Sequence, residues 1–306
     1  MKRRILSIAL TLCMVLSLVP TTVFAADPYD LYINNFRFSP TNLTFTSGGG
    51  SATYDPGSNT LTIKNLSLST GGANTIIQSG ISRLTIKIDG TLALNILASK
   101  AENGVDYGKN ITNYGIAVTA DTTICGANNN NNNNVDKDSI IITSQSTGID
   151  TVEYSDGTTR VGISAMCDAN MNVAKLTMKD LTVSMTDNST GDNAGHASMI
   201  RTQGNLNISG CKLVADKCQF GIFVDAHVPV TISNTEFSMA LNGEVSSGVN
   251  LAPNAVNVME NCSGSISAKY PIYTAGPLTI SGGSMKLVAS SSGILSGQNQ
   301  EYTPAI

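Results

Sequence analysis

The chain has 306 residues, of which 13% are charged, 5% are aromatic and none is Trp, and its formal net charge is −4. A nucleic-acid-binding protein needs a basic face and a coiled coil needs abundant Ala, Glu, Lys, Leu and Arg, so this composition excludes both classes. Hydrophobic residues make up 41% of the chain, enough for a packed core, and the 28 Gly residues lack the three-residue period of collagen.

The first 25 residues have the pattern of a secretory signal peptide. Lys2–Arg4 is basic, Ile5–Val19 is mostly apolar, and Val23 and Ala25 suit the positions before a cleavage site. The apolar run is shorter than the roughly 20 residues that span a bilayer, so we expect cleavage after Ala25 and no membrane span. The mature chain then has 15 basic and 22 acidic residues. We expect it to be secreted or held at the cell surface, in a style that resembles exported proteins of Gram-positive bacteria.

The mature sequence is built from a repeated pattern. An apolar–polar–apolar motif recurs at Leu61–Ile63, Leu84–Ile86, Leu176–Met178, Leu206–Ile208, Val230–Ile232, Val256–Val258 and Leu278–Ile280. A second set of aliphatic residues, usually preceded by Gly, comprises Ile116, Ile163, Ile200, Ile222, Val249, Ile272 and Ile294. A third set follows the first motif and comprises Val183, Leu213, Phe237, Ile266 and Met285. Ile266 follows its motif at a longer interval, which predicts an insertion at that corner.

Three short strands per repeat predict a three-sided β-solenoid. Each strand alternates, so its flanking aliphatic side chains point to one side and its central Thr or Asn to the other. Stacked coils bury the apolar side and exchange backbone hydrogen bonds at about 4.8 Å spacing. Gly, Asn, Ser and Asp supply corners with positive φ. A β-sandwich is the alternative fold.

The repeats resemble a known family over residues 54–297. Their pattern is similar to the right-handed parallel β-helix of the pectin-lyase-like superfamily. The segments Leu31–Asn35, Gly48–Gly50 and Tyr54–Ile63 resemble the opening of secreted clostridial-type β-helix proteins, which are often described as carbohydrate-binding. The resemblance implies an all-β, right-handed parallel β-helix. Because a solenoid needs a cap over its first coil, we predict an N-terminal cap at 26–53 and repeats over 54–306.

A long polar segment, 186–196, contains the first candidate site. Asp187, Asp192 and Asn193 offer the hard oxygen ligands that Ca²⁺ favours in flexible loops. His196 and Arg201 follow closely and complete a predicted binding site. The alternative is a solvated loop with Asx turns.

A second candidate site follows the run of Asn residues at 128–134. Asp136 and Asp138 are predicted to hold Ca²⁺ or sugar hydroxyl groups. The alternative is a low-complexity tract without a ligand.

The chemistry of the superfamily's enzymes has little counterpart in this sequence. Its lyases depend on Ca²⁺ held by stacked carboxylates and use an Arg or Lys base, whereas the four Arg residues of the mature chain lie in no obvious carboxylate array. The hydrolases of the superfamily have a group of short motifs that includes an Asp-Asp pair, and this sequence has no such pair. Gly195–Ala197 is the nearest match to the Gly-His-Gly motif of these hydrolases. Arg201 is the nearest match to their Arg-Ile-Lys motif, but the Ile-Lys that should follow it is absent. Catalytic residues are therefore not predicted.

Tyr270 and Tyr273 are the aromatic candidates for sugar binding. Their spacing of three does not place them on one face of a regular strand, so the sequence predicts no shared stacking platform. Rows of Thr, Asn and Asp would then bind an extracellular polysaccharide, including acidic plant or microbial glycans bridged by Ca²⁺.

The leading functional prediction is a secreted, non-enzymatic polysaccharide-binding or surface-adhesion protein. The alternative is a calcium-dependent polysaccharide lyase of the pectate type, and the third is a structural spacer. No capping pattern follows Ile294. We therefore expect a longer chain, or a further domain or subunit that covers this end of the solenoid.

Five cysteines remain after the signal peptide: Cys125, Cys167, Cys211, Cys218 and Cys262. An odd number cannot all pair within one chain. We expect small apolar residues buried in the core, and the pairing of Cys211 with Cys218 stays open.

Overall fold

The computed structural model describes residues 27–70, 75–98, 112–127, 138–146, 159–189, 196–225, 227–243, 245–251, 255–291, 293–296 and 302–303. The predicted signal peptide, the Asn run and residues 190–195 of the polar segment lie outside these ranges. The described residues form strands and turns without a helix. No helix that is long and apolar enough to cross a membrane occurs among them.

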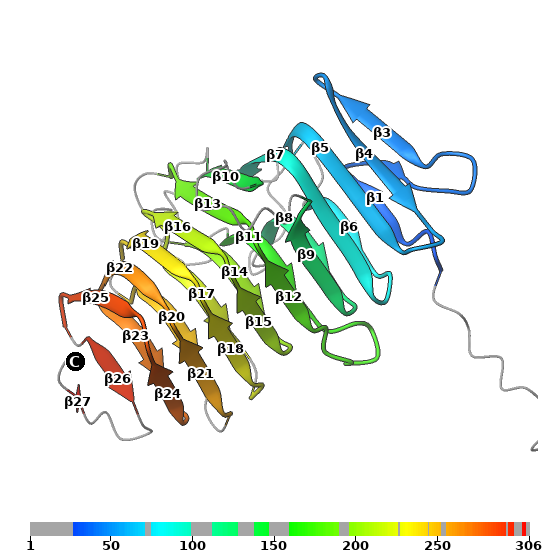
Figure 1. Ribbon diagram of the computed structural model, residues 1–306. Coiled ribbons are helices and arrows are strands. Elements are labelled where there is room, and N and C mark those ends of the chain that lie inside the picture. The colour runs from blue at the N-terminus through cyan, green and yellow to red at the C-terminus, as the bar shows by residue number, and fades with distance from the viewer. Residues whose placement is uncertain are drawn as a thin grey trace, which may run out of the picture.

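Antiparallel strands begin the described chain, in the segment for which we predicted a cap. They are β1 (Leu31–Ile33), β2 (Phe36–Arg37), β3 (Thr44–Ser47) and β4 (Gly50–Asp55). β1 pairs with β2 and with β6 (Thr75–Ser79), and β4 pairs with β3 and with β5 (Thr60–Ser69). These strands therefore lie against the first parallel strands of both sheets (Figure 1).

The remaining strands fall into three rows, and successive strands of the chain visit the rows in turn. Row one consists of β6, β8 (Thr112–Val118), β11 (Thr159–Ala165), β14 (Ala197–Thr202), β17 (Phe220–Val224), β20 (Ser247–Leu251), β23 (Tyr270–Thr274) and β26 (Ile294–Ser296). All of these neighbours pair in parallel, and β27 (Tyr302–Thr303) adds an antiparallel strand after β26.

Rows two and three belong to one sheet because the long strands β5 and β7 (Leu84–Ala98) run through both rows. Row two continues through β9 (Thr122–Gly126), β12 (Leu176–Lys179), β15 (Leu206–Ser209), β18 (Val230–Ser233), β21 (Asn257–Glu260) and β24 (Leu278–Ser281). Row three continues through β10 (Ser139–Ser146), β13 (Thr182–Asp187), β16 (Lys212–Asp216), β19 (Glu236–Ala240), β22 (Ser263–Ala268) and β25 (Ser284–Ala289). Figure 1 shows each row as a series of neighbouring arrows along the stack.

The parallel pairing confirms the predicted repeat and is not that of an antiparallel sandwich. The second predicted set of aliphatic residues forms one continuous column in row one, since Ile116, Ile163, Ile200, Ile222, Val249, Ile272 and Ile294 are successive register partners. Close approach explains the Gly before several of them. A Cβ at Gly221 would lie 2.6 Å from the carbonyl oxygen of Gly248 in the next strand.

The predicted register is wrong in β21. Asn257, rather than Val256, lies opposite Val230 and Leu278, and Val256 is 65% exposed. Asn257 is buried, and its Nδ2 donates to the carbonyl oxygen of Ala255 over 3.2 Å. Because a polar residue occupies the apolar column in this repeat, the sequence pattern placed the motif one residue too early.

The predicted insertion before Ile266 is wrong for the same reason. Gly264 lies opposite Phe237 and Met285, in the inward position predicted for Ile266. Ile266 is one inward position further along the strand, opposite Met239. With Asn257 as its anchor, Gly264 restores the interval of the other repeats, so no extra residue is needed at this corner.

Residues with positive φ form the turn between rows two and three, as predicted. Asp180, Gly210, Asn234, Asn261 and Gly282 have φ angles of 52, 63, 48, 51 and 64°. Their amides continue the pairing from one repeat to the next: the amide of Asp180 donates to Ser209 over 3.1 Å and that of Asn234 to Glu260 over 2.9 Å. Gly and Asn tolerate this left-handed backbone, which explains their abundance.

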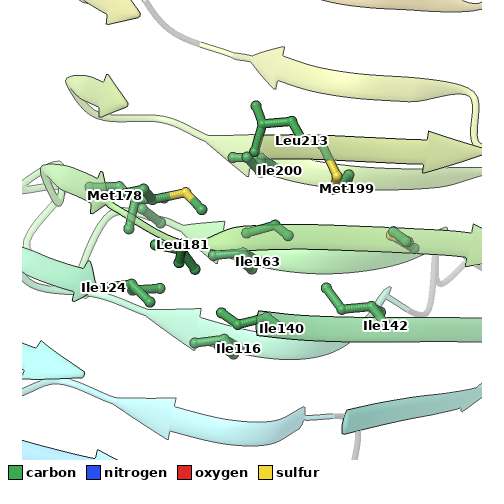
Figure 2. Close-up of a cluster of buried hydrophobic side chains, with 14 of the residues drawn as sticks. Ile116, Ile124, Ile140, Ile142, Ile163, Met178, Leu181, Met199, Ile200 and Leu213 are labelled. Atoms are coloured by element: carbon green, nitrogen blue, oxygen red, sulfur yellow. The ribbon is translucent and has the colours of Figure 1, made fainter. Parts of the chain in front are cut away.

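The inward side chains of all three rows form one hydrophobic cluster. Figure 2 shows part of it, with Ile116, Ile163 and Ile200 of row one near Ile140 and Leu213 of row three. A row on its own would expose these aliphatic side chains, so the three rows depend on one another for burial.

All five cysteines are free thiols. Cys211, Cys218 and Cys262 are buried as predicted, whereas Cys125 and Cys167 are only half-buried. Burial, reinforced by the negative charge of Asp187, raises the pKa of the Cys218 thiol. This thiol is therefore protonated at neutral pH and poorly nucleophilic.

The turn between rows two and three provides a test of the backbone constraint. A Cβ at Gly210 would lie 2.3 Å from Asp180 Oδ1, on a backbone with φ of 63°. We expect Gly210→Val to lower the free energy of unfolding by about 1–2 kcal/mol, because a branched side chain disfavours the left-handed region. Chemical denaturation followed by circular dichroism measures the change.

Asn234→Gly is the matched control, because it keeps the left-handed backbone at the equivalent corner of the next repeat. We expect its unfolding free energy to stay within about 0.5 kcal/mol of the parent protein. Equal losses for the two variants would contradict this account of the corner.

Candidate functional site

Row-one strands depart from simple alternation, and this departure creates the candidate site. In β17, Gly221 and Ile222 are both buried, while Phe220 and Phe223 on either side of them are half-buried. β23 has the same burial pattern. Two consecutive inward residues bring the residues before and after them to the same outer face.

The prediction that Tyr270 and Tyr273 do not share a face is therefore wrong. Their ring centroids lie 6.4 Å apart with an interplanar angle of 62°. Pro271 and Ile272 are both buried between them. The spacing rule failed because it assumed a regular strand, in which a residue three positions away lies on the opposite face.

The two aromatic pairs are aligned along the stack. Phe220 lies opposite Ser247, which lies opposite Tyr270, and Phe223, Asn250 and Tyr273 form the second column. We define the aromatic face as these six residues of β17, β20 and β23: Phe220, Phe223, Ser247, Asn250, Tyr270 and Tyr273. Parallel strands are separated by about 4.8 Å, so the two pairs are about 9.6 Å apart with one polar strand between them.

The strand between the aromatic pairs contributes small polar groups. Ser247 is 1% exposed although it belongs to an outward column, because larger side chains precede and follow it there. Its Oγ has no hydrogen-bond partner among the described residues. Asn250 is half-buried and presents an amide between Phe223 and Tyr273.

Two cations contact the rings of the aromatic face. The guanidinium carbon of Arg201, which lies opposite Phe223, is 5.4 Å from the centroid of that ring. Arg201 Nε also donates to Asp225 Oδ2 over 2.6 Å, which orients the guanidinium. Nζ of Lys269 is 5.6 Å from the Tyr270 centroid. The face thus combines apolar rings with charged donors at its edges, an arrangement suited to stacking and hydrogen bonding.

Asp187, predicted as a calcium ligand, lies in a buried polar network. Strand β13 extends to Asp187, so the loop begins one residue later. The side chains of Arg160 and Asp187 are 0% and 1% exposed, and Arg160 Nη2 lies 3.1 Å from Asp187 Oδ2. The hydroxyls of Ser144 and Ser189 donate to Asp187 Oδ1 over 2.8 and 2.9 Å. In this geometry the carboxylate compensates a buried guanidinium.

The other predicted site residues are dispersed. The backbone carbonyl of His196 accepts a hydrogen bond from the amide of Arg160 over 3.1 Å, so His196 is near the buried network. Arg201 belongs to the aromatic face described above. Asp192 and Asn193 lie outside the described residues.

Asp138 is at the opposite end of row three from Asp187, because Ser139 lies opposite Thr182 and Ser144 lies opposite Asp187. Asp138 Oδ1 accepts from the amide of Gly90 over 2.8 Å. Asp136 lies outside the described residues. In the described part of the chain, no three His, Cys, Asp or Glu side chains gather as a metal site would require.

Sequence reasoning missed Phe220 and Phe223. Their signal was present as an aromatic residue on each side of a two-residue inward motif, repeated at Tyr270 and Tyr273. Recognising it requires the register of row one, because only the register aligns the two pairs across Ser247 and Asn250.

The Arg160–Asp187 pair provides a test of the buried network. We expect Asp187→Ala to lower the free energy of unfolding by about 3–5 kcal/mol, because it leaves a buried guanidinium without its carboxylate. Urea denaturation of the purified variant measures the loss.

Asp225→Ala, which removes the carboxylate from the more exposed pair with Arg201, is the control. Its expected cost is about 0–1 kcal/mol. The double variant Arg160→Met/Asp187→Leu should recover most of the stability lost by Asp187→Ala. Similar losses for Asp187→Ala and Asp225→Ala would show that burial of the pair is not the deciding factor.

Comparison of the chain with models of protein families, with curated proteins and with solved structures finds no match. A function must therefore be inferred from the residues of the aromatic face and their geometry.

Proposed function

We propose that this protein binds extracellular polysaccharide through its aromatic face, as a secreted, non-enzymatic binding or surface-adhesion protein. The observation that carries the proposal is the alignment of two half-exposed aromatic pairs on one side of row one. Sugar rings present apolar C–H faces that pack on aromatic rings. Asn250 and Lys269 supply the hydrogen-bond donors, and Asn250 the acceptor, that sugar hydroxyls need.

We further propose that the three rows close into a right-handed, three-sided β-helix similar to that of the pectin-lyase-like superfamily. The regular order of the rows and the common hydrophobic cluster support closure. Crossover connections between parallel strands of one sheet are almost always right-handed, which supports a right-handed helix. Such a helix holds row one rigid, so that the aromatic face is organised before a ligand arrives.

Secretion is the expected location of a polysaccharide-binding protein. The basic start, apolar run and cleavage pattern of residues 1–25 support it. An extracellular protein of this kind encounters glycans as polymers. Several weak contacts along one polymer then act together and raise the overall affinity.

Affinity electrophoresis in gels that contain plant or microbial polysaccharides tests the proposal. We expect retardation by at least one neutral glycan and a loss of affinity of about tenfold for Tyr273→Ala, because one stacking surface is removed. Tyr32→Ala is the matched control, since Tyr32 is a half-buried tyrosine on β1, in the antiparallel segment.

The same glycans, incubated with Ca²⁺ or with a chelator, separate binding from catalysis. Ultraviolet absorbance from unsaturated uronates that grows only with Ca²⁺ would identify a lyase and overturn the non-enzymatic proposal. Absence of both retardation and product on every glycan would favour a structural spacer.

A further inference from the structure

We propose that the aromatic face binds a flat, unbranched, uncharged 1,4-linked glycan whose chain runs along the stack, across β17, β20 and β23. Sugar rings n and n+2 pack on Phe220/Phe223 and on Tyr270/Tyr273, and ring n+1 lies over Asn250. This inference rests on the proposed polysaccharide-binding function and adds the shape, charge and direction of the ligand.

The shape of the ligand is inferred from the distance between the two aromatic pairs. The pairs lie two strands apart, or about 9.6 Å. In a flat 1,4-linked chain with equatorial linkages, each ring is turned over relative to the one before it. Rings n and n+2 therefore present the same face, and one disaccharide separates them by about the spacing of the two pairs. A helical or strongly bent chain cannot place alternate rings on both pairs at once.

The middle strand supports the same assignment. Ring n+1 is turned over about the chain axis, so it presents its other C–H face, and its equatorial hydroxyl groups project from the edges of the chain. Asn250, half-exposed between Phe223 and Tyr273, offers an amide that both donates and accepts. Ser247 is buried in the other column, so Asn250 is the residue through which the middle strand contacts ring n+1.

The charges around the face favour an uncharged chain. Arg201, which lies over Phe223, already forms an ion pair with Asp225. Its guanidinium therefore has little net charge to offer a uronate. Lys269 contacts the Tyr270 ring at the edge of the face and is a single donor rather than a row of cations.

Titration calorimetry with a length series of β-1,4-linked gluco-, manno- and xylo-oligosaccharides tests this inference. A trisaccharide is the shortest chain that reaches both aromatic pairs. We expect affinity to rise about tenfold or more from disaccharide to trisaccharide for at least one series, because the second contact becomes intramolecular, and then to change little.

Variants test whether the step in affinity belongs to the two pairs. Tyr273→Ala should remove the step, while Tyr273→Phe, which keeps a ring, should retain it. Phe223→Ala should remove it as well, and Tyr32→Ala should not. Circular dichroism of each variant establishes that the fold is intact.

The outcomes separate this inference from the function on which it rests. If no glycan binds at any length, the proposed function fails. If glycans bind without a step at the trisaccharide, or if β-1,3-linked, α-1,4-linked or oligogalacturonate chains bind equally well, the polysaccharide-binding function stands and the inferred ligand shape or charge is wrong.

Discussion

Backbone hydrogen bonds between successive parallel strands are the interaction on which the rest of the molecule depends. They hold neighbouring strands about 4.8 Å apart and keep equivalent residues of successive repeats in register. The corner amides of Asp180, Gly210 and Asn234 extend this pairing through the turns. Because register is preserved, one aliphatic residue per repeat becomes a continuous buried column. The same constraint aligns outward residues, so the aromatic face is a direct product of the pairing that builds the core.

The repeat was predictable from the sequence wherever its inward positions are aliphatic. The Ile column of row one and the Gly or Asn corners required only local patterns, and both were found. The assignment failed at Val256 and Ile266, because Asn257 and Gly264 take the inward positions in that repeat. The buried Asn257 is tolerated since a hydrogen bond to the backbone compensates part of its polar group. Hydrophobic pattern cannot identify such a substitution.

The candidate site was less predictable because it depends on contacts between distant segments. Tyr270 can be identified in the sequence as an aromatic candidate, but its alignment with Phe220 depends on the register of the intervening Ser247. Asp187 was expected to face a ligand, whereas Arg160 satisfies it from inside the fold. Neither sequence distance nor residue type distinguishes a ligand carboxylate from one that compensates a buried guanidinium. Tertiary structure determines both outcomes.

The position of the two aromatic pairs on separate strands also has an evolutionary consequence. The distance between them is a whole number of strand separations, so a point mutation cannot adjust it gradually. Gain or loss of one repeat between β17 and β23 would change it by about 4.8 Å in a single event. Proteins of this architecture can therefore acquire a new spacing between two aromatic pairs by unequal recombination between repeats, while the core positions remain compatible.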